Sequence, residues 1–161
     1  MIELYHGSNL TITKIDLSKS KKGKDFGCGF YLNPNKEQAM EMAIRTTKRM
    51  TNGRPIVSCF MFDLSHASEE LNIRVFDDYS IEWAEFILSN RRNKEDSNIH
   101  NFDVVIGPIA DDTVGLQMHR YLQGYIGMDK MIEELRFRPN PAKQYFFGTQ
   151  RSLNYLTPVQ L

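Results

Sequence analysis

Apolar and polar positions alternate in two short stretches near the two ends of the chain. Residues 1–6 alternate and are followed by a Gly-Ser pair, which predicts a strand that ends at His6 and enters a loop. Residues 144–147 (QYFF) predict a second short strand. A helical turn that uses Leu153 and Leu156 is expected to follow it.

Between these stretches the apolar positions recur with the period of an amphipathic helix, interrupted by apolar strands. Asn35 is the expected N-cap of the first helix, and Gly53 and Pro55 are expected to end it. Residues 56–64 are apolar on both faces, which predicts a central strand. Helices are predicted at residues 36–50, 77–90, 113–122 and 129–136, and a further strand at 102–106.

This order of elements predicts the fold class. The strands cluster towards both ends of the chain with helices between them, so distant segments must share a sheet, which is typical of an α+β domain. The chain has 161 residues and shows no internal repeat, low-complexity tract or linker. We therefore expect one domain over residues 1–161.

Charge and hydropathy narrow the classes of function. Twenty basic residues balance twenty acidic ones, so the formal net charge is zero and extensive binding to nucleic-acid backbones is disfavoured. No apolar run approaches the ~20 residues that span a bilayer. The N-terminus lacks the pattern of a signal peptide. We expect a cytoplasmic protein with no membrane partner.

The cysteine and histidine pattern bears on redox and metal chemistry. The two cysteines, Cys28 and Cys59, lack CxxC spacing and are interpreted as reduced, buried structural thiols. His66, His100 and His119 are scattered without the spacing of metal ligands. No metal site is expected.

The first candidate site is the segment His6-Gly7-Ser8 at the exit of the first strand. It combines an imidazole, a flexible backbone amide and a hydroxyl, which can converge on a small polar ligand. In the alternative interpretation, His6 only makes a hydrogen bond inside the fold and the other two residues form an ordinary turn. The segment by itself fits both.

The second candidate site lies in the segment DFGCGFYL, which begins at Asp25. Gly27 and Gly29 let the chain pass close to something bulky, and Tyr31 offers a flat face for stacking on an aromatic ring. The GxG lacks the rest of the dinucleotide pattern GxGxxG, and the chain contains no GxxxxGK[ST] phosphate loop.

A basic run precedes this second site. Such lysines can attract a diphosphate or an acidic macromolecule as point charges, although a run of this kind is more often a solvated loop. The run consists of Lys19, Lys21, Lys22 and Lys24.

Together, His6 in YHGS, Tyr31 in DFGCGFYL and Gln144 in QYFFGT resemble the three-part signature of the ADP-ribosyltransferase superfamily. The match is to its His-Tyr-Glu/Gln/Asp branch, which includes diphtheria-toxin-like and poly(ADP-ribose)-polymerase-like enzymes. The chain is more closely similar to a bacterial family of uncharacterised domains placed in that superfamily, which shares YHGS, KDFGxGFYL, WxxFIxxNR at 83–92 and DVVIGPIADD at 103–112. The likeness runs from residue 4 to residue 156.

This resemblance implies a split, strongly bent β-sheet that binds NAD+ as a substrate in a cleft. It implies that His6 hydrogen-bonds a ribose hydroxyl, that the Gly7 backbone binds the nicotinamide carboxamide, and that Tyr31 stacks on the nicotinamide ring. Gln144 takes the last motif position, where enzymes with Glu place a carboxylate against the nicotinamide ribose. The other residues expected to bind NAD+ are Ser8, Asp25, Gly27 and Gly29.

The activity implied is that of a mono-ADP-ribosyltransferase, a glycosyltransferase that cleaves the nicotinamide glycosidic bond and transfers ADP-ribose to a protein, nucleic-acid or small-molecule acceptor. Fixing ring and ribose while polar groups meet the developing charge would accelerate this reaction. The resemblance also implies two biological roles for a small enzyme of this kind. It would act as a toxin whose partner is an antitoxin, or as an effector in phage defence.

Three alternatives stay open. With water as the acceptor, the protein would be an NAD+ glycohydrolase. Because the amide of Gln144 brings no negative charge to a cationic transition state, a catalytically silent NAD+-binding or interaction module is also consistent with the sequence. In a third reading, the lysines of residues 19–24 hold a nucleic-acid acceptor beside the bound NAD+.

Overall fold

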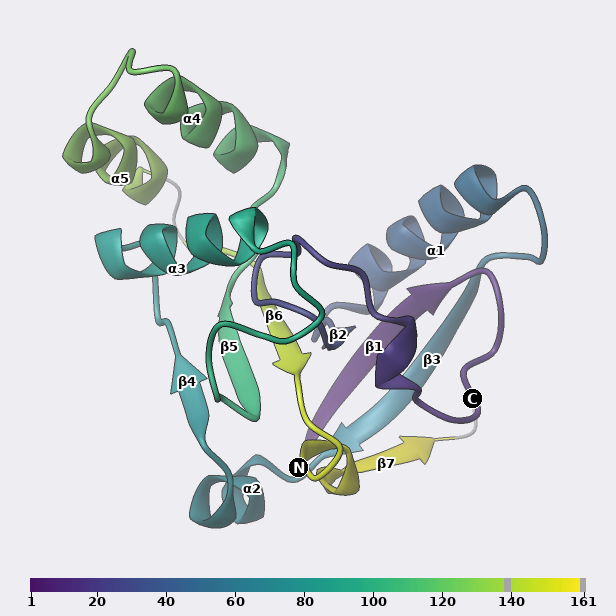
Figure 1. The fold of residues 1–161 in the computed structure, drawn as a ribbon. Coiled ribbons are helices and arrows are strands. Elements are labelled where there is room, and N and C mark those ends of the chain that lie inside the picture. Colours follow the sequence, from purple (N-terminus) through teal and green to yellow (C-terminus); the bar gives the residue numbers. More distant parts are fainter. Residues whose placement is uncertain (138–139, 160–161) are drawn as a thin grey trace.

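The computed structural model describes residues 1–137 and 140–159 (Figure 1). The last two residues of the predicted domain lie outside the described residues. The strands are β1 (Ile2–Ser8), β2 (Phe30–Leu32), β3 (Ile56–Phe62), β4 (Ile73–Val75), β5 (Val104–Pro108), β6 (Lys143–Phe147) and β7 (Leu156–Val159). The helices are α1 (Lys36–Met50), α2 (Leu64–Glu70), α3 (Ile81–Arg92), α4 (Asp112–Leu122) and α5 (Met128–Arg136), with short 3-10 helices η1 (Leu17–Lys19) and η2 (Ser152–Tyr155). Within the described part this is an α+β fold, as the sequence predicts.

The strands form two sheets. Sheet A has the order β1-β3-β7 and is antiparallel, so the predicted central position of β3 is confirmed. Sheet B has the order β2-β6-β5-β4, in which only the pair of β4 and β5 is parallel. In Figure 1, sheet B lies on the left and sheet A on the right, and β2 is the edge strand of sheet B that lies nearest to sheet A. Segments far apart in the sequence thus become neighbours in both sheets.

One isolated bridge joins the two sheets. The backbone amides of Tyr5 and Asn33 each donate to the carbonyl of the other at 2.8 Å. Beyond this bridge, no further backbone pairing between β1 and the β2 segment is described. We call this unpaired stretch, residues 6–8 and 29–31, the β1–β2 split.

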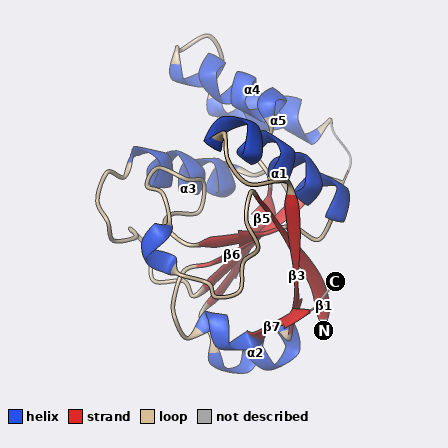
Figure 2. Cartoon of the chain, turned by 90° about the vertical axis from the view of Figure 1, so that its right-hand side faces the viewer, coloured by secondary structure: helices blue, strands red, loops and turns tan. Residues whose placement is uncertain are grey.

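Two hydrophobic clusters lie on opposite faces of sheet B. Because successive strand residues point to opposite faces, Phe146 and Phe147 of β6 enter different clusters. Phe147 packs with residues of sheet A such as Leu4 and Phe62, so this cluster lies between the sheets. Phe146 packs with residues of α3, α4 and α5, including the fully buried Trp83, which confirms the prediction that Trp83 is a core residue. Figure 1 shows these three helices together at the upper left, and Figure 2 shows α4 and α5 at the top, with α3 below them on the left.

Helix α1 covers the outer face of β1. The prediction of Asn35 as its N-cap is confirmed, because the Asn35 side chain accepts a hydrogen bond from the Gln38 amide at 2.9 Å. The helix approaches β1 closely at Gly7. A Cβ atom on Gly7 would lie 1.8 Å from the carbonyl oxygen of Ala39. Only glycine therefore permits this packing.

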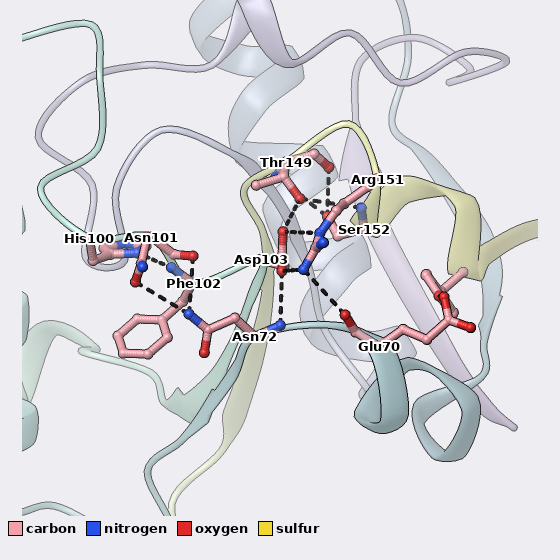
Figure 3. A network of polar contacts seen from close by, with 10 residues as sticks. Glu70, Asn72, His100, Asn101, Phe102, Asp103, Thr149, Arg151 and Ser152 are labelled. Atoms are coloured by element: carbon pink, nitrogen blue, oxygen red, sulfur yellow. Dashed lines mark hydrogen bonds and ion pairs between the residues drawn. The ribbon is translucent and has the colours of Figure 1, made fainter.

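A buried carboxylate ties sheet B to the C-terminal segment (Figure 3). Asp103, 4% exposed, precedes β5 and accepts two hydrogen bonds from the guanidinium of Arg151, at 2.9 and 2.6 Å. It also accepts a hydrogen bond from the Thr149 hydroxyl at 2.7 Å and one from the backbone N–H of Asn72 at 2.8 Å. The segment before β4, the start of β5 and the segment after β6 are thus fixed to one side chain.

Several predicted boundaries are wrong for local reasons. The strand predicted over 56–64 ends at Phe62, because Asp63 accepts from the His66 amide and begins α2, which was not predicted. Helix α3 starts at Ile81 because Ser80 is its N-cap. The terminal helical turn ends before Leu156, which begins β7 opposite Phe62.

Strand β1 continues past His6 to Ser8, because β3 pairs with it over its full length. No helix within the described residues has the length and apolar character needed to cross a bilayer.

Candidate functional site

His6 lies in β1 at the β1–β2 split, with its Nδ1 2.9 Å from the carbonyl oxygen of Tyr31. Because a carbonyl only accepts, Nδ1 carries the proton and Nε2 presents a lone pair. Burial lowers the pKa of His6, the bond to the Tyr31 carbonyl partly opposes this, and the charge of Lys24 lowers the pKa further. The ring also stacks on Phe30, with centroids 4.5 Å apart. His6 is therefore a neutral, fixed hydrogen-bond acceptor.

Gly7 presents its backbone to the same split. The amide and carbonyl of Tyr5 point towards Asn33, and strand groups two residues apart point to the same edge. The amide and carbonyl of Gly7 therefore face β2. Continuing the antiparallel register from the bridge puts Gly7 level with Tyr31.

Tyr31 is held by its hydroxyl and leaves part of its ring available. The hydroxyl donates to the Gly27 carbonyl at 2.7 Å and accepts from the Phe26 amide at 3.1 Å. Burial raises the pKa of Tyr31, which keeps the hydroxyl protonated for this role. Its ring meets Phe146 edge-on at 5.3 Å and Phe26 at 6.5 Å, and Lys24 Nζ lies 5.1 Å from its centroid.

Gln144 lies in β6 on the same face of sheet B as Tyr31. It is two residues from Phe146, which is the cross-strand partner of Tyr31. Its Nε2 is buried and has no hydrogen-bond partner among the described residues. Buried polar atoms are normally paired, so this amide lacks the hydrogen-bond partner that a fold ordinarily supplies.

The structure brings these three residues onto neighbouring strands, but not all of their side chains onto one face. Tyr31 and Gln144 point towards the cluster of α3, whereas His6 packs on Phe30, which lies on the opposite face of β2. His6 meets Tyr31 through the backbone carbonyl only. A ligand that contacts all three must reach across β2.

The two glycines of the second candidate site have packing reasons of their own. Gly27 has a φ of 100°, and a Cβ there would lie 2.3 Å from Asn98 Oδ1. A Cβ on Gly29 would lie 2.2 Å from Cε2 of Phe146. The bulky groups that these glycines admit are thus side chains of the protein itself.

Residues that the sequence analysis did not assign to the site hold the loop of residues 24–28. Asn98 accepts from the Cys28 amide at 2.6 Å and donates to its carbonyl at 2.9 Å. His100 Nε2 donates to the Phe26 carbonyl at 2.7 Å, and Arg91 pairs with Asp25 at 2.6 Å. The one sequence signal for these loop anchors is the motif at 83–92, which contains Arg91 but by itself indicates no role for it. Asp25 therefore anchors the loop.

All four lysines of the run are exposed. Lys22 pairs with Asp96 at 2.8 Å. Lys24 differs from the others because its ammonium contacts the Tyr31 ring.

Both cysteines are free thiols, but only one fits its predicted location. Cys59 is buried as predicted, whereas Cys28 is partly exposed because it lies in the loop of residues 24–28 and not in a core. Across the described residues, no three His, Cys, Asp or Glu side chains converge in a group that could hold a metal ion.

Two cavities lie away from the predicted site residues. One, of about 420 Å³, lies between Ile81 and the exposed face of α5. The other, of about 440 Å³, lies around His66 and Arg151. Neither is lined by the predicted site residues His6, Tyr31 or Gln144.

Comparison with known families matches residues 2–157 to the family described as "Protein of unknown function (DUF3990)". The match covers nearly the whole chain. The chain belongs to the DUF3990 family. No curated protein matches this DUF3990 domain. Membership thus assigns a family without assigning an activity.

The stability of the DUF3990 domain is expected to fall at mildly acidic pH. His100 accepts from the Phe102 amide at Nδ1 and donates at Nε2, so it must be neutral when folded. Burial lowers its pKa, with the bond to the Phe26 carbonyl partly opposing this. Because the folded pKa lies below the ordinary value, the unfolded chain binds more protons, and stability is lost as the pH falls through about 6.5. His6 acts in the same direction.

Thermal unfolding followed by circular dichroism between about pH 7.5 and pH 5.5 checks this expectation. The melting temperature of the wild type should fall on acidification, and His100→Gln, which keeps a donor for the Phe26 carbonyl, should reduce the fall. His119→Gln, at an exposed position of α4, is the matched control and should keep the wild-type slope. Equal slopes for the wild type and His100→Gln would contradict the assignment.

Proposed function

We propose that this protein is an NAD+-dependent mono-ADP-ribosyltransferase. The observation that carries the proposal is the neutral His6 imidazole, bonded to the Tyr31 backbone in the β1–β2 split with its Nε2 free to accept. The buried, unpartnered amide of Gln144 on the adjoining strand supports it. The resemblance of the three motifs to the ADP-ribosyltransferase superfamily supplies the ligand, NAD+.

Each residue has a role in this reaction that follows from its contacts. His6 Nε2 accepts a hydrogen bond from a hydroxyl of the nicotinamide ribose, and the Gly7 amide and carbonyl bind the carboxamide. The Tyr31 ring stacks on the nicotinamide. The Gln144 amide donates to a ribose oxygen. Together these contacts fix the leaving group and the ribose relative to each other.

The chemistry is a substitution at the anomeric carbon of the ribose. The bond between this carbon and the nicotinamide nitrogen breaks, its electron pair leaves with the nicotinamide, and the positively charged ring becomes neutral. The nucleophilic atom of the acceptor forms the new bond and releases its proton to solvent. Because Gln144 contributes no negative charge to the oxocarbenium-like transition state, we expect slow turnover compared with an enzyme that has a carboxylate there.

Nicotinamide release and transfer of labelled ADP-ribose test the proposal. The purified protein is incubated with labelled NAD+, with and without a cell lysate. His6→Ala and Tyr31→Ala should each lower product formation by about 100-fold, because they remove contacts that orient the reacting groups. His66→Ala, an exposed histidine at the other end of the molecule, is the matched control and should match the wild type.

The outcomes of this assay separate the alternatives. Release of nicotinamide and ADP-ribose without a labelled acceptor would assign the glycohydrolase. A protein that does not release nicotinamide and shows no NAD+ binding by calorimetry would contradict the proposal, as would full activity in His6→Ala.

The second candidate function is a catalytically silent NAD+-binding module. One observation favours it: the last motif position holds an amide, Gln144, in place of a carboxylate. Calorimetry that detects NAD+ binding, together with no release of nicotinamide, would assign this function instead.

A further inference from the structure

Lys24 covers the part of the Tyr31 ring that the core leaves available. Its Nζ lies 5.1 Å from the ring centroid, in the geometry of a cation–π contact. Phe146 meets the ring edge-on, Phe26 packs at 6.5 Å, and the hydroxyl is bonded to the backbone of residues 26 and 27. Any ring that stacks on Tyr31 therefore competes with Lys24.

The ammonium of Lys24 is held by this aromatic ring and not by a carboxylate. The adjacent Asp25 is bonded to Arg91 at 2.6 Å, and within the described part of the chain no ion pair of Lys24 is found. Desolvation lowers the pKa of Lys24, the charges of Lys21 and Arg49 lower it further, and the charge of Asp25 partly opposes this. The ammonium of Lys24 thus lies near other cations, and its close contact is with the Tyr31 ring.

We propose that Lys24 occupies, in the free protein, the place over Tyr31 that the positively charged nicotinamide ring of NAD+ takes in the complex. This inference rests on the proposed function. The nicotinamide ring of NAD+ carries a positive charge on its nitrogen, so it is attracted to the same electron-rich face as an ammonium group. The two cations exclude each other both by volume and by charge, so NAD+ binding displaces Lys24.

This exchange also affects the product. After the glycosidic bond breaks, nicotinamide is neutral and loses the cation–π attraction to Tyr31, whereas Lys24 keeps its charge. Lys24 therefore regains the ring face from the product more easily than from the substrate. It acts as an internal competitor that favours release of nicotinamide.

Calorimetric titration of wild type and two Lys24 variants tests this proposal. Lys24→Ala removes the competing cation and should bind NAD+ about tenfold more tightly. Lys24→Arg keeps the charge and stacks better on aromatic rings, so it should bind NAD+ more weakly than the wild type. ADP-ribose, which lacks nicotinamide, should bind the wild type and both variants equally. Lys22→Ala, in the same loop but paired with Asp96, is the matched control and should bind NAD+ as the wild type does.

The N-methylnicotinamide cation and neutral nicotinamide serve as probes of the ring face alone. The gain in affinity on Lys24→Ala should be larger for the cation. If Lys24→Ala weakens NAD+ and ADP-ribose equally, Lys24 contacts the diphosphate and the proposal is wrong. Unchanged NAD+ affinity in a protein that binds NAD+ overturns only the role of Lys24. Absence of NAD+ binding in the wild type and in every variant overturns the proposed function as well.

Discussion

Asp103→Ala is expected to lower the free energy of unfolding by about 3–5 kcal/mol. The substitution removes a buried carboxylate that accepts four hydrogen bonds, two of them from the Arg151 guanidinium. The Asn72 amide and the Thr149 hydroxyl lose their acceptor. Because these donors belong to segments that flank β4 and β6, both neighbours of β5 lose part of their attachment. Chemical denaturation at neutral pH measures the loss.

Two further variants make this result specific. Asp103→Asn keeps the shape and part of the hydrogen bonding, so its loss should be smaller. Asp96→Ala removes an exposed carboxylate that pairs with Lys22, and surface pairs contribute little, so its stability should stay close to the wild type. A loss for Asp103→Ala no larger than that for Asp96→Ala would show that the network does not hold the sheet.

The network also has a pH signature. Burial opposes ionisation of Asp103, but the hydrogen bonds from Arg151, Thr149 and Asn72 outweigh it and lower the pKa below the ordinary 3.8. Because the pKa of Asp103 is lower in the folded state, its contribution to stability is complete above pH 3.8. That contribution is lost as the pH falls through the pKa of the folded state. The stability difference between the wild type and Asp103→Ala should therefore be constant near neutral pH and narrow only in strong acid.

Gly7→Ala is expected to destabilise the fold by about 3 kcal/mol, at the upper end of the usual cost of overpacking. Its Cβ would lie 1.8 Å from the Ala39 carbonyl and 2.8 Å from the Ala43 amide, and both are backbone atoms of α1. No side-chain rotation can relieve these contacts, so the helix must move off β1. If the proposed function holds, NAD+ binding should be lost together with the packing, because the Gly7 backbone also faces the β1–β2 split.

Gly115→Ala is the matched control for this experiment. Gly115 lies inside α4, and a Cβ added there meets nothing within 4 Å. Alanine is favoured over glycine inside a helix, so stability should rise by about 0.5–1 kcal/mol. Thermal unfolding of the two variants should therefore shift in opposite directions. A Gly7→Ala protein as stable as the wild type would mean that α1 does not pack on β1 as described.

The long elements could be predicted from the sequence because their apolar spacing is strong. The helices around Ala39 and Trp83 and the apolar strand β3 have this property. Helix α2 has seven residues and β4 has three, so neither spans enough turns or alternations for a pattern to show. Leu156 was assigned to a helical turn because its pairing with Phe62, across most of the chain, leaves no local signal.

The candidate site could be predicted in part. The motifs located His6, Tyr31 and Gln144, and pairing of β2 with β6 brings the last two onto one face. The position of His6 on the other face of β2 could not be predicted, because it depends on how the two sheets join at Tyr5 and Asn33. Asn98 and His100 were missed as loop anchors because they act on a segment about seventy residues away in the sequence, through one or two hydrogen bonds each.

The partial exposure of Cys28 offers a native attachment point for a fluorescent reporter. Cys59 is buried in β3 of sheet A, so a thiol-reactive dye should label the loop of residues 24–28 in preference to the rest of the fold. Lys24 lies in the same loop, four residues before the label. Emission from a dye at Cys28 would therefore follow movement of this loop in real time as ligands are mixed with the protein, without any engineered cysteine.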